Sequence, residues 1–295
     1  MTQENQRLSY VFLGVVVLVW GPNPGIVKFA YRDIHPVLFA AMRFTVSGIL
    51  MLFVILWKEK DCRIRREDWK ALLLTGGLGV GVYQILWSFG LERTTATNSA
   101  ILVSVQTIFG VVCAGIITKE SVRKGQYIGM LLALVGVILV IMKPTARLQF
   151  STATFWGDLL TLIAGAVYTV FFSMWPKPLL KIYSPMRLMG YCMIIGATVL
   201  WIAVPFCVSR VEVEKVGWMA WGSLGYAVFF AGMVGHTLYY EGIGRLGVAR
   251  TFIFMYFIPF FAALFNYLFV GENIFLQQIA GGVIILSGIH CALRK

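Results

Sequence analysis

The chain has 295 residues, of which 59% are hydrophobic and 13% are charged, and its mean hydropathy is +0.81. Soluble domains are about 45–50% apolar and about 25% charged, so this composition excludes an ordinary water-soluble protein. It predicts an all-α polytopic membrane protein. The net charge of +12 does not indicate nucleic acid as a partner, because the Lys and Arg residues lie in short loops between apolar segments, where they set membrane orientation.

Ten segments are long and apolar enough to cross a bilayer, which takes about 20 predominantly apolar residues per helix. In chain order they are 8–29, 36–57, 71–91, 96–118, 125–142, 156–176, 185–207, 219–240, 248–270 and 275–293. The connections between them are too short to form a soluble domain. The first segment is too long for a signal peptide and lacks a small-residue cleavage site after it, so we expect it to be retained as a helix.

The loop charges predict the orientation of these segments. Because each segment crosses the membrane, successive loops lie on alternating sides. Most Lys and Arg residues of the loops then fall on the same side as the N-terminus, above all in residues 58–70. Cytoplasmic loops carry the excess of Lys and Arg in membrane proteins. Both termini are therefore predicted to be cytoplasmic.

An internal repeat relates the two halves of the chain. Residues 90–138 align without a gap with residues 242–290, with identities that include Gly90/Gly242, Arg93/Arg245, Glu120/Glu272, Gly129/Gly281 and Gly136/Gly288. The alignment predicts two five-helix repeats, residues 8–142 and 156–293. Five is odd, so the second repeat enters the membrane inverted, an arrangement that is typical of alternating-access transporters with a site near the midplane.

The first predicted helix carries two prolines at membrane depth. Pro22 and Pro24 remove backbone donors, so the helix is predicted to break beside Trp20 and Asn23. Freed carbonyl groups need protein or a wet cavity around them. We expect Trp20 and Asn23 to line a solute cavity, the alternative being a simple kink near the outer end.

The second predicted helix contains an arginine, Arg43, about 10 Å from its outer end. A guanidinium at that depth costs a few kcal/mol unless it is paired. Arg43 either attracts an anionic group of the solute or pairs with Asp158, which is predicted to lie at a comparable depth.

Further polar and aromatic residues fall near the middle of the later predicted helices. Gln84 is a candidate because of its depth, and Gln106 has an amide group that suits an amino or carboxylate group, the alternative for Gln106 being a helix-to-helix hydrogen bond. Aromatic residues recur on single helix faces and predict a cavity wall or ordinary packing. The remaining candidates for the cavity are Tyr168, Tyr256 and Pro259.

His236 lies roughly one and a half turns from the cytoplasmic end of the eighth predicted helix, 219–240. Its unperturbed pKa lies near neutrality, so it is a candidate proton relay, and protons are a candidate coupling ion. The alternative is a packed, hydrogen-bonded histidine. Glu120 and Glu272 precede the last helix of each repeat, where negative charge favours a helix N-terminus, and we expect a structural role for both.

Several short motifs resemble those of the drug/metabolite transporter superfamily, specifically EamA-type permeases. In the first half they are Trp20-Gly21, Pro36 followed by Arg43, the small polar run 94–100, and Glu120 with Gly129 and Gly136. In the second half they are Pro259, Glu272, Gly281 and Gly288. The resemblance implies a bacterial-type inner-membrane carrier that moves small metabolites, often outward, with amino acids and related compounds as common substrates.

Two departures from the family pattern affect the predicted helices. Thr107 stands where the family usually has a proline in the fourth helix, so a kink symmetrical to that at Pro259 is in doubt. Pro22, Asn23 and Pro24 replace the usual small polar residue and aromatic, which strengthens the predicted break in the first helix.

Other function classes fit less well. The chain has no Walker motif, HExxH or GxSxG, and its histidines are far apart, so neither direct ATP coupling nor an enzyme is predicted. No cofactor is expected. The five cysteines are widely spaced without a CxxC pair, which indicates neither a disulfide framework nor a metal site. A lipid or lipid-linked sugar flippase is the main alternative to a metabolite exporter, with membrane lipid then the substrate as well as the solvent.

Overall fold

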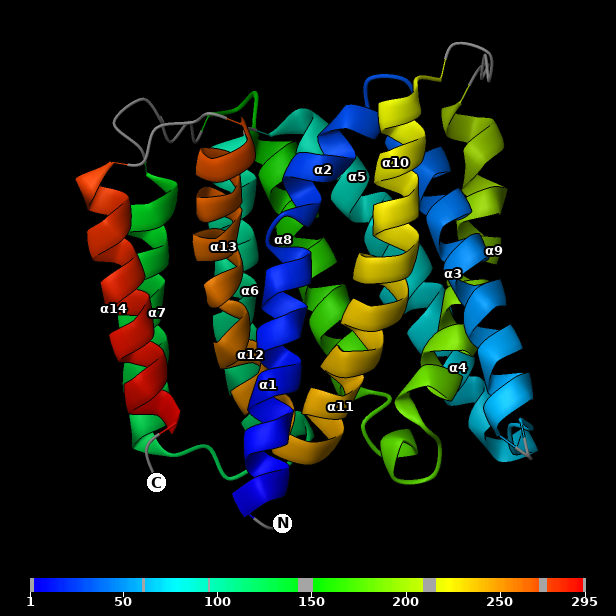
Figure 1. Ribbon diagram of the computed structural model, residues 1–295, viewed down its shortest axis with the longest axis horizontal. Helices are drawn as coiled ribbons and strands as arrows, with labels where there is room; N and C mark the ends of the chain where they lie inside the picture. The colour runs from blue at the N-terminus through cyan, green and yellow to red at the C-terminus, as the bar shows by residue number, and fades with distance from the viewer. Residues whose placement is uncertain are drawn as a thin grey trace.

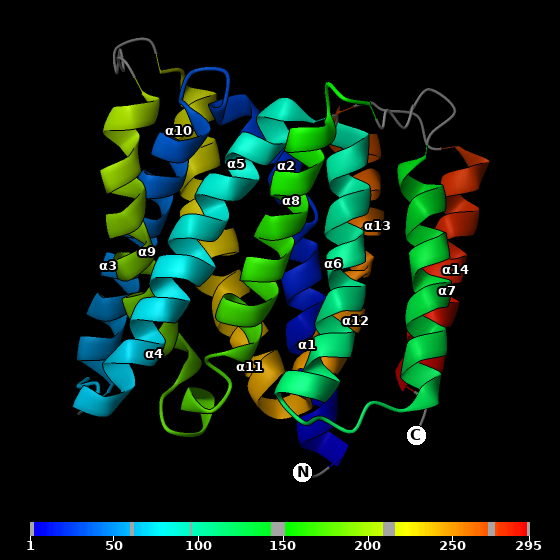
Figure 2. The same cartoon turned by 180° about the vertical axis from the view of Figure 1, so that it is seen from behind.

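The computed structural model describes residues 3–59, 62–94, 96–142, 151–208, 216–270 and 275–293. These residues form a bundle of helices without strands (Figure 1). The first helix begins and the last helix ends on the same side of the bundle, as Figures 1 and 2 show from opposite directions. We call this side the terminal face and the other side the distal face.

The first half of the chain begins with a helix in two pieces and ends with a helix that packs against the last one of the chain. Its elements are α1 (Gln3–Trp20), α2 (Asn23–Ala30), α3 (Pro36–Lys58), η1 (Arg66–Asp68), α4 (Trp69–Leu74), η2 (Thr75–Val82), α5 (Tyr83–Arg93), α6 (Ala96–Ile117) and α7 (Lys124–Ile141).

The second half contains more interrupted helices. Its elements are α8 (Phe155–Val167), η3 (Tyr168–Met174), η4 (Leu179–Lys181), α9 (Pro185–Cys207), α10 (Trp218–Tyr226), η6 (Ala227–Gly235), α11 (His236–Leu246), α12 (Val248–Met255), α13 (Phe257–Phe265), η7 (Asn266–Val270) and α14 (Leu276–Leu293). The segments η2, η3, η6 and η7 are π-helical and continue the helices that flank them.

Eight helices in the described residues are long and apolar enough to cross a membrane. They correspond to eight of the ten predicted segments, and 96–118 and 219–240 are not among them. The predicted segment 185–207 coincides with α9, whereas 219–240 is too short, because α10, η6 and α11 continue to Leu246. The continuous helix that α10, η6 and α11 form is rich in glycine, tryptophan and tyrosine, so its hydropathy is a weak signal of a membrane span.

The two predicted helix breaks occur where the prolines place them. Helix α1 ends at Trp20 and α2 begins at Asn23, with Gly21 and Pro22 in the turn between them. In the second half, α12 ends at Met255 and α13 begins at Phe257. Pro259 lies in the first turn of α13, where its missing N–H and its ring disfavour a continuous helix through the preceding turn. Helix α6, which has Thr107 in place of a proline, is continuous.

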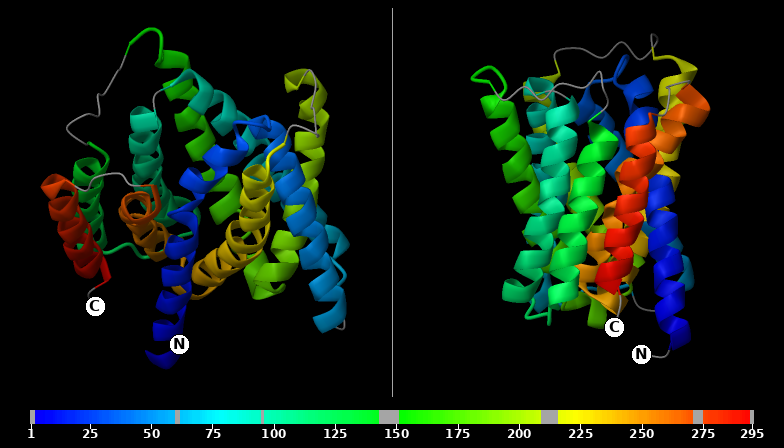
Figure 3. Two further views of the ribbon diagram at one scale, coloured as in Figure 1. Left: turned by 45° about the horizontal axis from the view of Figure 1, so that its top comes forward. Right: turned by 90° about the vertical axis from the view of Figure 1, so that its left-hand side faces the viewer.

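Glycines bring α7 and α14 into backbone contact. A Cβ atom on Gly129 would lie 2.3 Å from the carbonyl oxygen of Gly288, and one on Gly136 would lie 2.6 Å from that of Gly281. Close approach through small residues is the usual way in which membrane helices associate. The two helices therefore form one tight pair at the edge of the bundle (Figure 3).

A second pair joins the halves at the other edge, where α3 packs against α9. Gly48 of α3 lies against Ile194, and Gly196 of α9 lies against Val80 of η2. The terminal end of α9 is also fixed to the loop after α3, because Arg187 pairs with Glu59 and the hydroxyl of Ser184 donates a hydrogen bond to the Glu59 carboxylate. The core of the protein lies between these two edge pairs.

Candidate functional site

A group of aromatic rings occupies the centre of the bundle. Trp20 at the end of α1 lies 5.0 Å from His236 and 5.2 Å from Tyr239 between ring centroids. Phe172 of η3 lies 5.6 Å from His236, and Tyr168 stacks on Phe172 at 4.7 Å. The structure thus brings the predicted Trp20, Tyr168 and His236 together, from helices of both halves.

The π-helical segment η6 positions His236. The Nδ1 atom of His236 lies 2.8 Å from the carbonyl oxygen of Ala231 and 3.0 Å from that of Gly232. The indole N–H of Trp20 donates to the same Ala231 oxygen at 3.0 Å. A π-helix leaves carbonyl groups displaced from the regular pattern and often marks a functional site. Here the side chains of Trp20 and His236 satisfy them.

Arg43 lies next to this group. Its guanidinium carbon is 4.3 Å from the ring centre of Phe44, and the Phe44 ring is 6.2 Å from that of His236. Electrostatic interactions link Arg43 to Tyr31, Tyr83 and His236. The Nε atom of Arg43 is buried without a hydrogen-bond partner, and Arg43 makes no ion pair with any described residue.

The alternative in which Arg43 pairs with Asp158 is wrong. Asp158 lies near the start of α8, where its carboxylate accepts hydrogen bonds from the hydroxyl of Thr94 and from Asn98 at 3.1 Å. These donors belong to the start of α6 and the residues before it, so Asp158 fixes two helices at the distal face. The carboxylate that could have neutralised Arg43 is engaged there.

The other predicted residues lie at several places around the centre. Gln84 is buried on α5, directly after Tyr83, whose ring lies 4.9 Å from Tyr168. Asn23 begins α2 with a buried Oδ1 atom that has no partner among the described residues. Tyr256 is 1% exposed with a buried hydroxyl that likewise has none, and half-buried Pro259 follows it on α13.

Gln106 does not contact the aromatic group through any described interaction. Its side chain lies on α6 against Gly165 of α8, where an added Cβ would be 3.3 Å from the amide oxygen. Gln106 therefore lies at the contact between α6 and α8.

Four residues in or beside the group are missing from those predicted for the cavity: Phe44, Tyr83, Phe172 and Tyr239. A signal for the region exists in the sequence, because the shift that aligns 90–138 with 242–290 also aligns Gln84 with His236 and Trp20 with Phe172. The same shift places η2 over η6. Extending the repeat toward the N-terminus thus points to Phe172, the counterpart of Trp20, but not to Phe44, Tyr83 or Tyr239.

Side chains close the centre toward the terminal face. The hydroxyl of Tyr240 donates to the carbonyl oxygen of Phe172 at 2.8 Å, and Ser173 and Tyr239 share a hydrogen bond of 2.9 Å. Below them, α6 packs against α12, with Gly110 against the ring of Phe252. Beyond the break at Tyr256, α13 packs instead against α1, α2, α7 and α14.

Glu120 ties three segments together on the terminal face. Its carboxylate pairs with Lys177 at 2.6 Å and accepts hydrogen bonds from the backbone N–H groups of Val248 at 2.7 Å and Ala249 at 3.0 Å. The expectation that Glu120 favours the helix that follows it in the chain is wrong, because it caps α12 of the other half. Glu272 lies outside the described residues.

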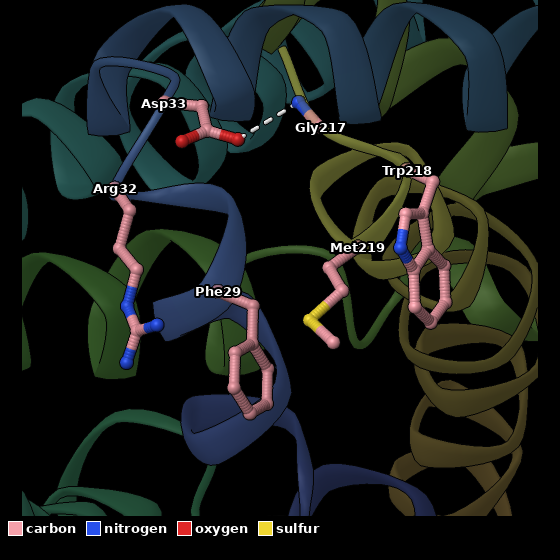
Figure 4. A pocket seen from close by; sticks show the side chains of 6 residues that line it. All are labelled: Phe29, Arg32, Asp33, Gly217, Trp218 and Met219. Atoms are coloured by element: carbon pink, nitrogen blue, oxygen red, sulfur yellow. Dashed lines mark hydrogen bonds between the residues drawn. The ribbon is translucent and has the colours of Figure 1, made fainter.

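A separate pocket of about 260 Å³ lies at the distal face, between the end of α2 and the start of α10 (Figure 4). Asp33 accepts a hydrogen bond from the backbone N–H of Gly217 at 2.9 Å beside it. The residues that line the pocket are Phe29, Arg32, Asp33, Gly217, Trp218 and Met219. None of the residues predicted for the site lines this pocket.

The sequence and the fold are similar to those of known proteins. The EamA-like transporter family matches residues 7–142 and 155–294. The uncharacterized transporter YyaM of Bacillus subtilis (strain 168) is 25% identical over 285 residues, which cover 96% of this chain and 92% of that protein. A probable terminal-alkyne amino-acid exporter of Streptantibioticus cattleyicolor is 24% identical over 233 residues, 79% of this chain and 76% of that protein. A crystal structure of a protein with 16% identity has a TM-score of 0.79 and covers 97% of both chains, which shows a common fold.

Proposed function

The chain belongs to the EamA-like transporter family, and we propose that it exports small metabolites, such as amino acids or related compounds, across the inner (plasma) membrane by alternating access. Ten membrane-spanning helices form two inverted repeats, residues 8–142 and 156–293, and both termini face the cytoplasm. The solute's own gradient or an exchange with protons supplies the energy.

The observation that carries this proposal is the unpaired Arg43 in the interior. A cation within a membrane-spanning helix costs a few kcal/mol unless something compensates it. No described carboxylate pairs with Arg43, and the residues around it are rings and neutral polar groups. A solute with an anionic group compensates this charge whenever it is bound.

Three features support the inverted repeats. The same family matches both halves. The π-helical segments η2 and η6 fall at corresponding positions of the aligned halves. The edge pairs α7 with α14 and α3 with α9 each combine one helix from each half. Repeats of this kind place a solute site where the halves meet, which is where the rings and Arg43 lie.

The helix after Gly247 is broken into α12 and α13, and the packing of its two pieces supports a conformation that is open to the distal face. On the terminal side of Tyr256, α12 packs against α6, and on the distal side α13 packs on other helices. With basic loops on the terminal face, the positive-inside rule makes that face cytoplasmic. The centre is then reached from outside, and the contacts of Tyr239, Tyr240 and Glu120 close the cytoplasmic route.

His236 offers little support for proton exchange. Its Nδ1 atom is held by two carbonyl oxygens, and its ring neighbours are Trp20, Phe44 and Phe172. No carboxylate among the described residues contacts it. Facilitated movement of the solute is therefore favoured over proton coupling through His236.

The test compares small molecules in the medium of cells that express the chain, a Trp20→Ala, Tyr168→Ala variant at equal membrane abundance, or an empty vector. We expect a compound class that accumulates only with the unaltered chain. Its uptake into proteoliposomes with and without a pH gradient then separates facilitated from proton-coupled transport.

Two results would contradict the proposal. Media that match the empty vector would reject export. Movement of labelled lipid between the leaflets of proteoliposomes, without movement of any soluble compound, would favour the flippase alternative.

A further inference from the structure

We infer that Arg43 and His236 form a two-point site that binds both charged groups of a zwitterionic solute. The guanidinium of Arg43 binds the carboxylate, and the Nε2 atom of His236 accepts a hydrogen bond from the protonated amine. The inference rests on the proposed transport function and assigns one residue to each end of the solute. The rings of the central group hold an apolar or aromatic body between these two points.

The anion end follows from the state of Arg43. A guanidinium presents N–H donors in a planar fork that matches a carboxylate. The guanidinium carbon of Arg43 lies over the ring of Phe44, 4.3 Å from its centre, and this cation-π contact helps to position the fork. The buried Nε atom has no partner, so one donor of the fork stays unsatisfied until an acceptor enters. A carboxylate satisfies the donor and the charge at once.

The amine end follows from the hydrogen bonds of His236. Carbonyl oxygens only accept hydrogen bonds, so the Nδ1 atom that faces Ala231 and Gly232 carries the ring proton. In the neutral ring the lone pair then resides on Nε2, which becomes an acceptor. No described residue hydrogen-bonds Nε2. The three rings of Trp20, Phe44 and Phe172 hold the imidazole in place.

The two ends lie side by side because Phe44 connects them. Its ring centre lies 4.3 Å from the guanidinium carbon of Arg43 and 6.2 Å from the imidazole ring centre of His236, so both side chains adjoin the same ring. Both side chains are half-buried although rings from several helices surround them. Tyr83 and Tyr168, also half-buried, lie nearby with ring centres 4.9 Å apart and planes tilted by 51°, and they offer apolar faces to the body of the solute.

Three probes separate the two ends in a binding measurement. Phenylalanine has both groups, phenylalanine methyl ester lacks the carboxylate, and 3-phenylpropanoate lacks the amine. Calorimetric titration of the purified full chain in detergent gives a Kd for each probe. We expect phenylalanine to bind at least about tenfold more tightly than either analogue, since a hydrogen bond to a charged group contributes about that factor.

Two variants each remove the side chain that binds one end of the solute. Arg43→Gln is expected to weaken phenylalanine and 3-phenylpropanoate about 10- to 100-fold and to leave the methyl ester unchanged. His236→Asn keeps an amide that donates to the Ala231 and Gly232 carbonyls but removes the acceptor at Nε2. It is expected to weaken phenylalanine and its methyl ester about tenfold and to leave 3-phenylpropanoate unchanged.

Matched controls test whether the substitutions act locally. Arg93→Gln removes an exposed arginine that also lies over a phenylalanine ring, that of Phe89 at 5.3 Å. His290→Asn removes an exposed histidine at the end of α14. Both controls should bind all three probes like the unaltered chain, and far-UV circular dichroism should show the same helix content for every variant.

Several outcomes would overturn the two-point site. Equal losses for all three probes in either variant would assign a general packing role to that residue, and no loss would place the solute elsewhere. Failure of the unaltered chain to bind any probe would reject the zwitterion class. If the same preparation still exports another compound class from cells, the transport function stands while the two-point site fails.

Discussion

Glu120 illustrates how a single side chain joins segments that are distant in the sequence. Its carboxylate satisfies two of the free backbone N–H groups at the start of α12 and pairs with Lys177. Gly247, the residue before α12, has a φ of 89°, and an added Cβ there would lie 2.9 Å from the same carboxylate. Only glycine combines that backbone conformation with so close an approach.

Substitution of Glu120 should therefore lower stability. Glu120→Gln removes the ion pair and weakens the cap, and we expect a loss of roughly 1–2 kcal/mol in the free energy of unfolding. Denaturant titration in detergent measures it. The control is Glu67→Gln, which removes an exposed pair with Arg65 at 3.8 Å and should have little effect. Equal effects of the two substitutions would contradict the capping role.

The site could be predicted from sequence only in part. Polar and aromatic residues at membrane depth identified Trp20, Arg43, Tyr168 and His236, because each is costly or conspicuous there. The partner of Asp158 could not be derived, since helix depth gives height in the membrane but not the angle between helices. Which carbonyl groups receive His236 depends on a π-helical segment, and no sequence rule predicts one.

Among the elements, the breaks in helices could be predicted and the π-helical segments could not. Pro22 and Pro259 each lack the N–H that a regular helix needs, and the chain interrupts its helices beside them. The π-helical segments η2 and η6 contain no proline. Their shape depends on tertiary contacts, such as the hydrogen bonds from Trp20 and from Ser47, whose hydroxyl donates to the Val228 carbonyl oxygen at 3.1 Å.

The glycine contact between α7 and α14 leads to a prediction at this scale. Gly129→Ala places a methyl group against the backbone of Gly288, so the pair must separate, and we expect a loss of about 1–3 kcal/mol in unfolding free energy. Gly14→Ala in α1 is the control, because nothing lies within 4 Å of the added Cβ and alanine favours a helix. Thermal unfolding of both variants in detergent measures the effect, and we expect a lower unfolding midpoint for Gly129→Ala alone.

A Gly129→Ala variant as stable as Gly14→Ala would contradict the close pairing of α7 with α14. A gain in stability for Gly14→Ala fits the expectation, since glycine inside a helix costs roughly 0.5–1 kcal/mol relative to alanine.

For the whole molecule, the distribution of charge predicts the orientation in the membrane. The described Lys and Arg residues of the loops gather at the terminal face, around the ends of α3, α6 and α11, while the distal face has fewer. The positive-inside rule then predicts that the terminal face is cytoplasmic. The sequence alone leads to this orientation, because it depends on the order of segments and charges and not on how the helices pack.

Labelling of single cysteines checks the orientation. In a background without the five native cysteines, Arg32→Cys at the distal face should react with a membrane-impermeant maleimide in intact cells. Lys124→Cys at the terminal face should react only after the membrane is permeabilised. Both positions are exposed, so a failure to react reports the side of the membrane. The reverse pattern would place the termini outside and would turn the proposed export into import.

The pairing of α7 with α14 also has a consequence for synthesis of the chain, because the two helices are made at different times. Helix α7 leaves the ribosome long before α14, and at ~5–20 residues per second its partner follows roughly 7 to 30 s later. During that interval the Gly129 and Gly136 surface of α7, shaped for another backbone, faces lipid or an insertion factor. A chain truncated before α14 keeps that surface open, so we expect it to be recognised by membrane quality-control proteases and degraded even though its first half is intact.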